Sequence, residues 1–190
     1  MEATSSVKTY ERSAMNEANE YLSGNSEQHY MHSVLRERIV EHVFVGDALR
    51  RLWQRGVTEV ELLRAEFDAG GYDLVMSYGS IVRHIQFKAI VVGGSRTSIT
   101  ANLNLMQKPS GCILWIVVTP ALDVHSYLWF GSAPGQPLPD LREMKVAKHS
   151  KANAAGVKLE RLNQRVVPRS AFTPLASLDA VLEQLFGPLP

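Results

Sequence analysis

The sequence predicts an α/β fold in which a central mixed β-sheet is flanked by helices. Apolar side chains recur at helical spacing over residues 33–55, whereas residues 57–91 alternate with a period near two between Gly-containing turns. Residues 112–119 are apolar throughout, which is typical of a central strand buried on both faces. The length of 190 residues fits one core, so we expect a polar N-terminal arm over 1–32 and a single domain over 33–190.

Two helices are predicted from apolar spacing and end signals. The first begins at Ser33, whose hydroxyl can cap it, and ends before Gly56. A last helix follows Ser177 as its cap and stops at Gly187. The apolar residues that recur at helical spacing in the first helix are Val34, Leu35, Ile39, Val43, Leu49, Leu52 and Trp53.

Strands are expected between the helices. Short turns separate three of them, at residues 57–67, 72–78 and 81–91. Residues 97–108 fit either a strand or a short helix, because alternating apolar residues run into a Pro-Ser-Gly stop. Further strands follow at 112–119 and 126–130, and the Pro- and Gly-rich residues 133–139 predict a surface connection.

The composition is that of an ordinary globular protein, with 45% hydrophobic and 21% charged residues. No apolar run approaches the roughly 20 residues that span a bilayer, and the N-terminus lacks the basic start and apolar core of a signal peptide. The single cysteine, Cys112, lies in an apolar run and is expected to be a small buried hydrophobe. We therefore expect a cytoplasmic protein with no membrane partner.

A basic segment stands out from a nearly neutral chain. Residues 142–169 hold eight Lys or Arg against two Glu, a local charge of +6, although the whole chain has a net charge of +1. Such a segment can supply phosphate contacts to a nucleic acid, and a solvated loop is the other interpretation. The residues expected to make phosphate contacts are Lys148, Lys151, Arg161 and Arg165.

Polar residues on two neighbouring strands indicate a functional site. In the third strand, Gln86 and Lys88 lie on one face, while Phe87 between them lies on the other. A lysine inside a sheet is costly unless an anion pairs with it. Asp73 opens the preceding strand directly after two glycines, and a hairpin would carry it toward Gln86 and Lys88. An Asp beside Gly is also a common turn residue, so Asp73 alone does not define a site.

This pattern resembles the signature of the PD-(D/E)xK, or restriction-endonuclease-like, nuclease superfamily, in which an Asp opens one strand and an acid-x-Lys motif lies on the next. Asp73 stands thirteen residues before Gln86, and Gln86-Phe87-Lys88 takes the place of the acid-x-Lys motif. The helix before these strands often contributes a Glu in the superfamily. Glu37 and Glu41 both qualify, and the spacing of Glu41 from the first strand is the more similar. The resemblance covers about residues 33–119, and the Gln-x-Lys variant resembles an uncharacterised bacterial branch.

The resemblance implies a restriction-endonuclease-like fold and a Mg²⁺- or Mn²⁺-dependent DNA endonuclease. Asp73, Glu41 and Gln86 would then hold the metal ion, with Lys88 beside them in phosphodiester hydrolysis. Most members of the superfamily have Glu or Asp at the position of Gln86. An amide oxygen can bind a hard cation, but it attracts the cation less strongly than a carboxylate does.

Two other functions stay open. A module that keeps the nuclease fold without catalysis would bind nucleic acid or a protein partner, and Gln86 favours this alternative. An oligomeric interaction protein, in which the Asp-Gln-Lys spacing is accidental, is the other. The sequence leaves open a homodimer and does not distinguish DNA from RNA as the partner.

Overall fold

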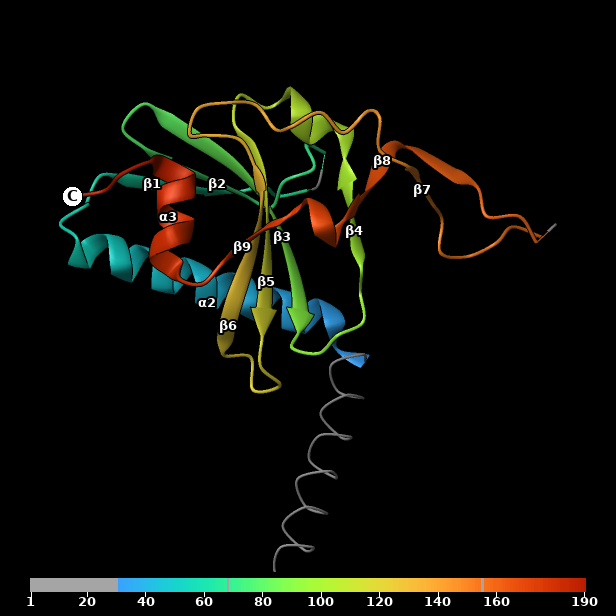
Figure 1. The fold of residues 1–190 in the computed structure, drawn as a ribbon, viewed down its shortest axis with the longest axis horizontal. Coiled ribbons are helices and arrows are strands. Elements are labelled where there is room, and N and C mark those ends of the chain that lie inside the picture. The colour runs from blue at the N-terminus through green and yellow to red at the C-terminus, as the bar shows by residue number, and fades with distance from the viewer. Residues whose placement is uncertain (1–30, 68, 155) are drawn as a thin grey trace, which may run out of the picture.

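The computed structural model describes residues 31–67, 69–154 and 156–190, so nearly all of the predicted N-terminal arm lies outside the described residues. In chain order, the helices and strands are α2 (Ser33–Gln54), β1 (Val60–Arg64), β2 (Leu74–Tyr78), β3 (Ile81–Val91), β4 (Ser98–Asn102), the 3₁₀-helix η1 (Leu103–Gln107), β5 (Gly111–Val118), β6 (Val124–Gly131), β7 (Val146–Lys148), β8 (Glu160–Pro168), the 3₁₀-helix η2 (Arg169–Ala171), β9 (Thr173–Leu175) and α3 (Leu178–Phe186). They form a mixed six-stranded sheet in the order β1-β2-β3-β5-β6-β9 and a three-stranded sheet in the order β4-β8-β7 (Figure 1).

The central sheet confirms the predicted mixed topology. It begins as an antiparallel meander of β1, β2 and β3. β3 then pairs in parallel with β5 after a crossover through β4 and η1, and β5 pairs antiparallel with β6. β5 is buried at every position, as its apolar sequence predicts. The ambiguous residues 97–108 contain both expected structures, since β4 leads directly into η1.

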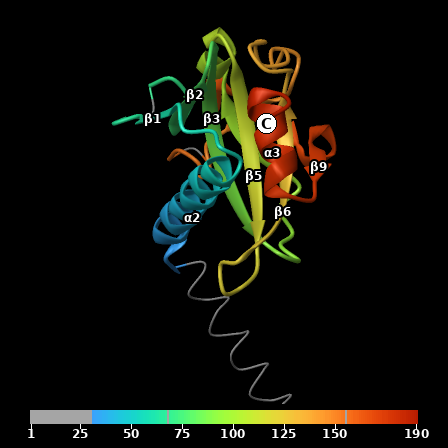
Figure 2. The ribbon, with the colours of Figure 1, turned by 90° about the vertical axis from the view of Figure 1, so that its left-hand side faces the viewer.

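The two faces of the central sheet pack against different layers. α2 and α3 cover one face, where Phe44 and Leu185 belong to the same core (Figure 2). The other face carries Trp115, which belongs to a second core with Ile99 of β4 and Val167 of β8. The prediction of a sheet flanked by helices is therefore correct for one face only. The basic segment forms β7 and β8 on the other side, although no strand was predicted there.

α2 covers the residues that the helical pattern predicts, but it buries a different face. The ring of Phe44 meets the ring of Phe87 edge to face, with 5.3 Å between their centroids. This aromatic contact turns the helix so that Phe44 and the small Ala48 lie against the sheet. The buried residues of α2 are Val40, Glu41, Phe44, Ala48 and Leu52.

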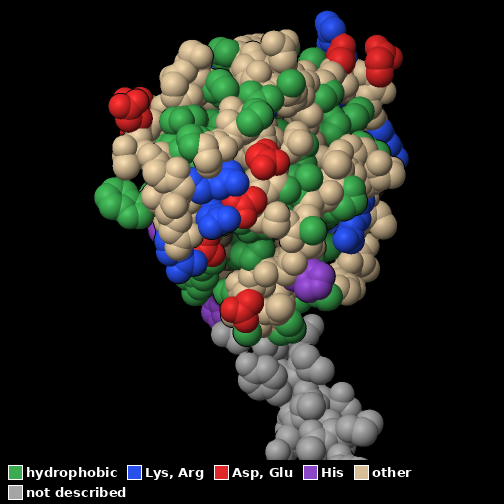
Figure 3. All heavy atoms as spheres, turned by 60° about the vertical axis from the view of Figure 1, so that its left-hand side comes forward, with side chains coloured by type: hydrophobic (Ala, Val, Ile, Leu, Met, Phe, Trp, Pro, Cys, Tyr) green, Lys and Arg blue, Asp and Glu red, His purple; other side chains and the backbone are tan. Residues whose placement is uncertain are grey.

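The set of apolar residues at helical spacing in α2 is not its buried face, since only Leu52 of the set is buried. The exposed fractions of its other residues run from 37% at Val43 to 74% at Val34. Hydrophobic side chains consequently reach the surface among charged ones (Figure 3). The N-cap is His32 rather than Ser33, and its side chain makes no capping hydrogen bond.

A buried arginine ties the end of α3 to the sheet. Arg83 of β3 is fully buried, and its guanidinium donates to the carbonyls of Leu185, Gln184 and Ser132 and to Oγ of Ser110. Burial lowers the pKa of Arg83. The carbonyls in the last turn of α3 form the negative end of the helix dipole, which compensates the buried cation in part.

The last helix and the lone cysteine agree with their predictions. Oγ of Ser177 accepts a hydrogen bond from the N–H of Ala180 at 3.2 Å, and Gly187 follows the helix with a φ of 83°. Cys112 is fully buried in β5, and burial raises the pKa of its thiol to about 12. Within the described residues, no helix is both long enough and apolar enough to cross a membrane.

Candidate functional site

The pairing of β2 with β3 ends next to Asp73. The two strands pair from their turn as far as Leu74 and Ile85. The backbone N–H of Asp73 donates to the carbonyl of Ile85 at 2.9 Å, and Oδ2 of Asp73 accepts a hydrogen bond from the N–H of Phe87 at 2.7 Å. Beyond this point β2 offers no backbone acceptor to β3. The carboxylate of Asp73 accepts the hydrogen bond instead and lies beside the part of β3 that β2 leaves unpaired.

A cavity of about 70 Å³ lies between α2 and this edge of β3. Glu41, Asp73 and Lys88 line it together with Glu37, which shares one side of α2 with Glu41. The structure thus brings three of the four predicted catalytic residues into one place. The rest of the lining is apolar and comes from the core: Val40, Phe87, Ala89 and Ile116.

Glu41 is a buried carboxylate with a second carboxylate nearby. It is 7% exposed, and burial, followed by the charge of Asp73, raises its pKa above the ordinary value. Two guanidinium groups oppose this shift: Nη1 of Arg38 lies 2.9 Å from Oε2 of Glu41, and Nη1 of Arg64 lies 3.5 Å from the same oxygen. Because the pKa stays raised, these two groups do not fully compensate for burial and for the charge of Asp73.

Arg38 and Arg64 are members of the site that sequence reasoning missed. Arg38 precedes Glu41 by three residues on one helix, a spacing that brings side chains together and was a usable signal. Arg64 comes from β1, and only the packing of the meander beside α2 brings it to Glu41. A local pattern does not encode that contact.

Gln86 lies outside the cavity because of the alternation of β3. Phe87 faces the helices, so Gln86 and Lys88 start from the opposite face, in register with Ile113 and Trp115. Gln86 is 5% exposed, and its Oε1 is buried without a hydrogen-bond partner. Lys88 is half-buried and still borders the cavity, and it makes no ion pair with a described residue.

The donor set fits a hard divalent cation, provided that other oxygens complete the shell. Two carboxylates, of Glu41 and Asp73, face one cavity, whereas Gln86 lies outside it. In the described part of the chain, no three His, Cys, Asp or Glu side chains lie close enough to hold a metal ion by themselves. Mg²⁺ commonly keeps several waters and binds one or two carboxylates with substrate oxygens, which suits this arrangement.

The predicted nucleic-acid contacts lie on a hairpin that extends away from the rest of the molecule (Figure 1). β7 and β8 pair antiparallel at its base. Lys148, Lys151 and Arg161 are exposed on this hairpin. Arg165 differs from them, because its guanidinium donates to backbone carbonyls, those of Arg142, Leu162 and Gln164.

The chain matches no model of a known protein family. A search of curated proteins gives no match either. The functional interpretation therefore depends on the cavity of Glu41, Asp73 and Lys88 and on the exposed basic hairpin.

Proposed function

We propose that the protein is a Mg²⁺- or Mn²⁺-dependent DNA endonuclease of the PD-(D/E)xK type. The observation that carries the proposal is the cavity in which Glu41, Asp73 and Lys88 meet at the end of the β2–β3 pairing. The connectivity supports it, because α2 precedes two neighbouring strands, of which one follows Asp73 directly and the other carries Lys88, in the order that the resemblance implies. The basic hairpin adds positive charge for a phosphate backbone.

Each residue of the cavity has a distinct role in this proposal. The carboxylates of Glu41 and Asp73 would hold the cation, which when bound supplies a Lewis acid and a more acidic water. The ammonium group of Lys88 would stabilise negative charge that develops on the phosphate. The N–H of Phe87 keeps the carboxylate of Asp73 in place through its 2.7 Å hydrogen bond. The apolar lining strengthens these electrostatic interactions because it excludes water.

A nuclease-fold module that binds nucleic acid without cutting it is the second candidate. The observation in its favour is that Arg38 and Arg64 already pair with Glu41, so positive charge is present without a metal ion. The position of Gln86 outside the cavity agrees with it as well. In this case the hairpin would bind DNA, and the cavity would only support the fold.

Nicking of supercoiled plasmid DNA in Mg²⁺ or Mn²⁺ tests the proposal. We expect Asp73→Asn and Lys88→Met each to lower the rate by about 10²–10³, as the loss of one well-aimed electrostatic group does. Glu59→Gln is the control, because Glu59 is an exposed carboxylate that does not line the cavity. If Asp73→Asn cuts as fast as the wild type, the cavity is not the active site. DNA binding without cutting in either metal would select the second candidate.

A further inference from the structure

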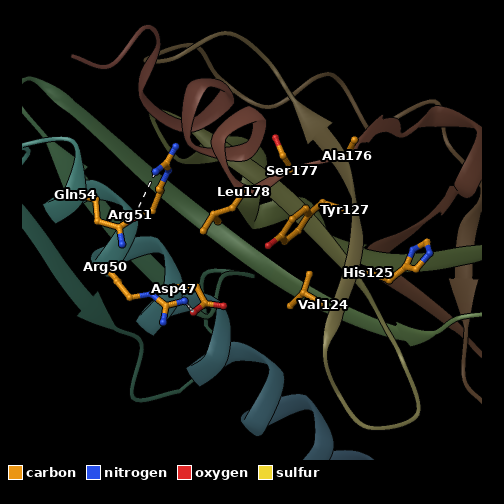
Figure 4. Close-up of a pocket in the computed structure, with 10 residues that line it drawn as sticks. All are labelled: Asp47, Arg50, Arg51, Gln54, Val124, His125, Tyr127, Ala176, Ser177 and Leu178. Atoms are coloured by element: carbon orange, nitrogen blue, oxygen red, sulfur yellow. Dashed lines mark hydrogen bonds and ion pairs between the residues drawn. The ribbon is translucent and has the colours of Figure 1, made fainter.

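A second cavity, of about 400 Å³, opens where the C-terminal half of α2 meets β6 and the start of α3 (Figure 4). Its walls include Arg50 and Gln54 of α2, Tyr127 of β6 and Ser177 before α3. Among the described residues, it shares no lining residue with the cavity of Glu41. Its size lies in the range of small-molecule sites, which run from about 300 to 1,000 Å³.

Tyr127 places its hydroxyl in this second cavity. The residue is 5% exposed, and its hydroxyl points into the space between Leu178 and Asp47 (Figure 4). It makes no hydrogen bond with a described residue. Burial, followed by the charge of Asp47, raises the pKa of Tyr127 to about 12, so the hydroxyl is a neutral donor near neutral pH. Because the hydroxyl is not among the buried polar atoms that lack a partner, it meets solvent in the cavity, where an accepting ligand oxygen can take the place of water.

The first turn of α3 adds backbone donors to the same wall. Oγ of Ser177 satisfies the N–H of Ala180, whereas the N–H groups of Leu178 and Asp179 donate to no described residue. Ser177 and Leu178 line the cavity, so the start of α3 forms part of its wall. Unpaired amides and the positive end of the helix dipole both favour an anion.

Arginines outnumber acids around the second cavity. Arg51 binds Asp179 through two hydrogen bonds of 2.8 and 2.9 Å, and Arg55 lies 3.7 Å from the same carboxylate. Among the described residues, Arg50 pairs only with Asp47, at 2.7 Å, and 71% of its side chain is exposed. Three guanidinium groups against two carboxylates leave one positive charge. Arg50 is the group that can most easily turn toward a ligand.

We infer that this cavity binds a small phosphate monoester, and the inference does not rest on the proposed nuclease function. The Tyr127 hydroxyl, the Arg50 guanidinium and the amides of α3 come from three different elements. Donors from several directions suit a tetrahedral phosphate, with its several accepting oxygens, better than a planar carboxylate. Val124 and Leu178 offer apolar contact to the organic part of the ligand. The phosphate competes with Asp47 for Arg50.

Calorimetric titration of the full chain with glycerol phosphate tests the inference. Tyr127→Phe keeps the packing of the ring and should weaken binding about three- to tenfold, the effect of removing one hydrogen bond. Arg50→Gln should weaken it more than about tenfold, because its hydrogen bond is charge-assisted. Asp47→Asn releases Arg50 and should tighten binding. Tyr78→Phe is the matched control and should leave the affinity unchanged, since Tyr78 packs on Phe186 and does not line the cavity.

Two other probes define the class of ligand. Dimethyl phosphate represents the diester of a nucleic-acid backbone, and acetate represents a carboxylate; both should bind more weakly than glycerol phosphate. Equal binding of either probe would overturn the assignment to a monoester. The site itself is overturned if glycerol phosphate does not bind, or if Tyr127→Phe and Arg50→Gln, shown to be folded by thermal melting, bind it as the wild type does.

Discussion

Glu41 shows how burial and a neighbouring charge act together on one side chain. Burial is the larger cause and Asp73 the smaller one, and both raise its pKa above the ordinary value of 4.5. The folded protein therefore holds a proton on Glu41 at pH values where the unfolded chain has lost it. The stability that this group contributes is fully present below the ordinary pKa and is lost as the pH rises through the raised pKa of the folded state.

Glu41→Gln should accordingly stabilise the fold at neutral pH, because it removes a buried charge that is only partly compensated. We expect its melting temperature to exceed that of the wild type by a few degrees at neutral pH, with the difference shrinking as the pH falls toward 4.5. Melting curves over a series of pH values measure the effect, and Glu37→Gln, at an exposed position, is the control. A Glu41→Gln protein that melts lower at neutral pH would show that the ion pairs with Arg38 and Arg64 outweigh the cost of burial.

Gln86 can be tested as a metal ligand through stability instead of activity. Gln86→Glu places a carboxylate where an amide oxygen is buried without a partner, so without metal it should destabilise the fold by about 1–3 kcal/mol. If Gln86 reaches the cation, added Mg²⁺ should restore much of this loss, and it should stabilise the variant more than the wild type. Gln136→Glu, at an exposed position, should show neither effect. A loss that Mg²⁺ does not restore would remove Gln86 from the proposed metal site.

At the scale of elements, Arg83 of β3 holds the last turn of α3 through hydrogen bonds to its carbonyls. Arg83→Met removes the donor to the carbonyls of Gln184 and Leu185 and should destabilise the fold by about 2–4 kcal/mol. Arg83→Lys should recover little, because an ammonium group lacks the planar fork of a guanidinium. Chemical denaturation measures the loss, and hydrogen exchange should show that the amides of α3 open first.

A surface arginine provides the comparison for Arg83. Arg142 pairs with Asp140 at 2.6 Å, but it is exposed, so Arg142→Met should cost far less stability than Arg83→Met. If Arg83→Met were as mild as Arg142→Met, the link between β3 and α3 would not contribute to the stability of the fold.

The elements predicted best from sequence are those whose own pattern decides their burial. β3 has the predicted bounds, β5 is buried throughout, and α3 has its predicted cap, since alternation, apolar content and capping are local properties. The rotation of α2 was not predictable, because apolar side chains lie on both sides of the helix and only contact with Phe87 selects one. β7 was missed because it has only three residues, and β8 because its first four residues are exposed and give no alternating apolar pattern.

In the candidate site too, the residues placed by local pattern were predicted and those placed by long-range packing were not. Asp73 and Lys88 lie near each other because a hairpin joins their strands, which the sequence signals. Glu41 was anticipated only through the resemblance. Arg64 joins the site through the packing of the meander, and Gln86 is kept out of the cavity by strand alternation combined with the placement of α2. The contact of Arg64 and the exclusion of Gln86 both depend on how α2 packs on the sheet, so residue spacing along the sequence could not predict them.

At the scale of the whole molecule, the basic hairpin separates positive charge from the compact part of the fold (Figure 1). Replacing Lys148 and Lys151 together with Gln should flatten the slope of log affinity against log salt for duplex DNA, by about 0.9 for each phosphate that these lysines neutralise. Arg165→Gln is the control, because its guanidinium binds backbone carbonyls; it should change stability more than the slope. An unchanged slope in the double variant would make the hairpin a solvated loop without a nucleic-acid partner.

The thiol of Cys112 can be used to measure how often the central sheet opens, because Cys112 is buried in β5. It is the only thiol in the chain, it is fully buried, and burial raises its pKa to about 12, so an alkylating reagent should modify it only when the central sheet opens. We expect labelling of the native protein to be at least about a thousandfold slower than labelling of the unfolded chain, given ordinary domain stabilities. Rapid labelling would instead show that β5 becomes accessible without global opening. A ligand that binds only the folded state lowers the fraction of open molecules and therefore slows the labelling of Cys112. The labelling rate would thus measure the binding of Mg²⁺ and of glycerol phosphate in one assay, without any engineered probe.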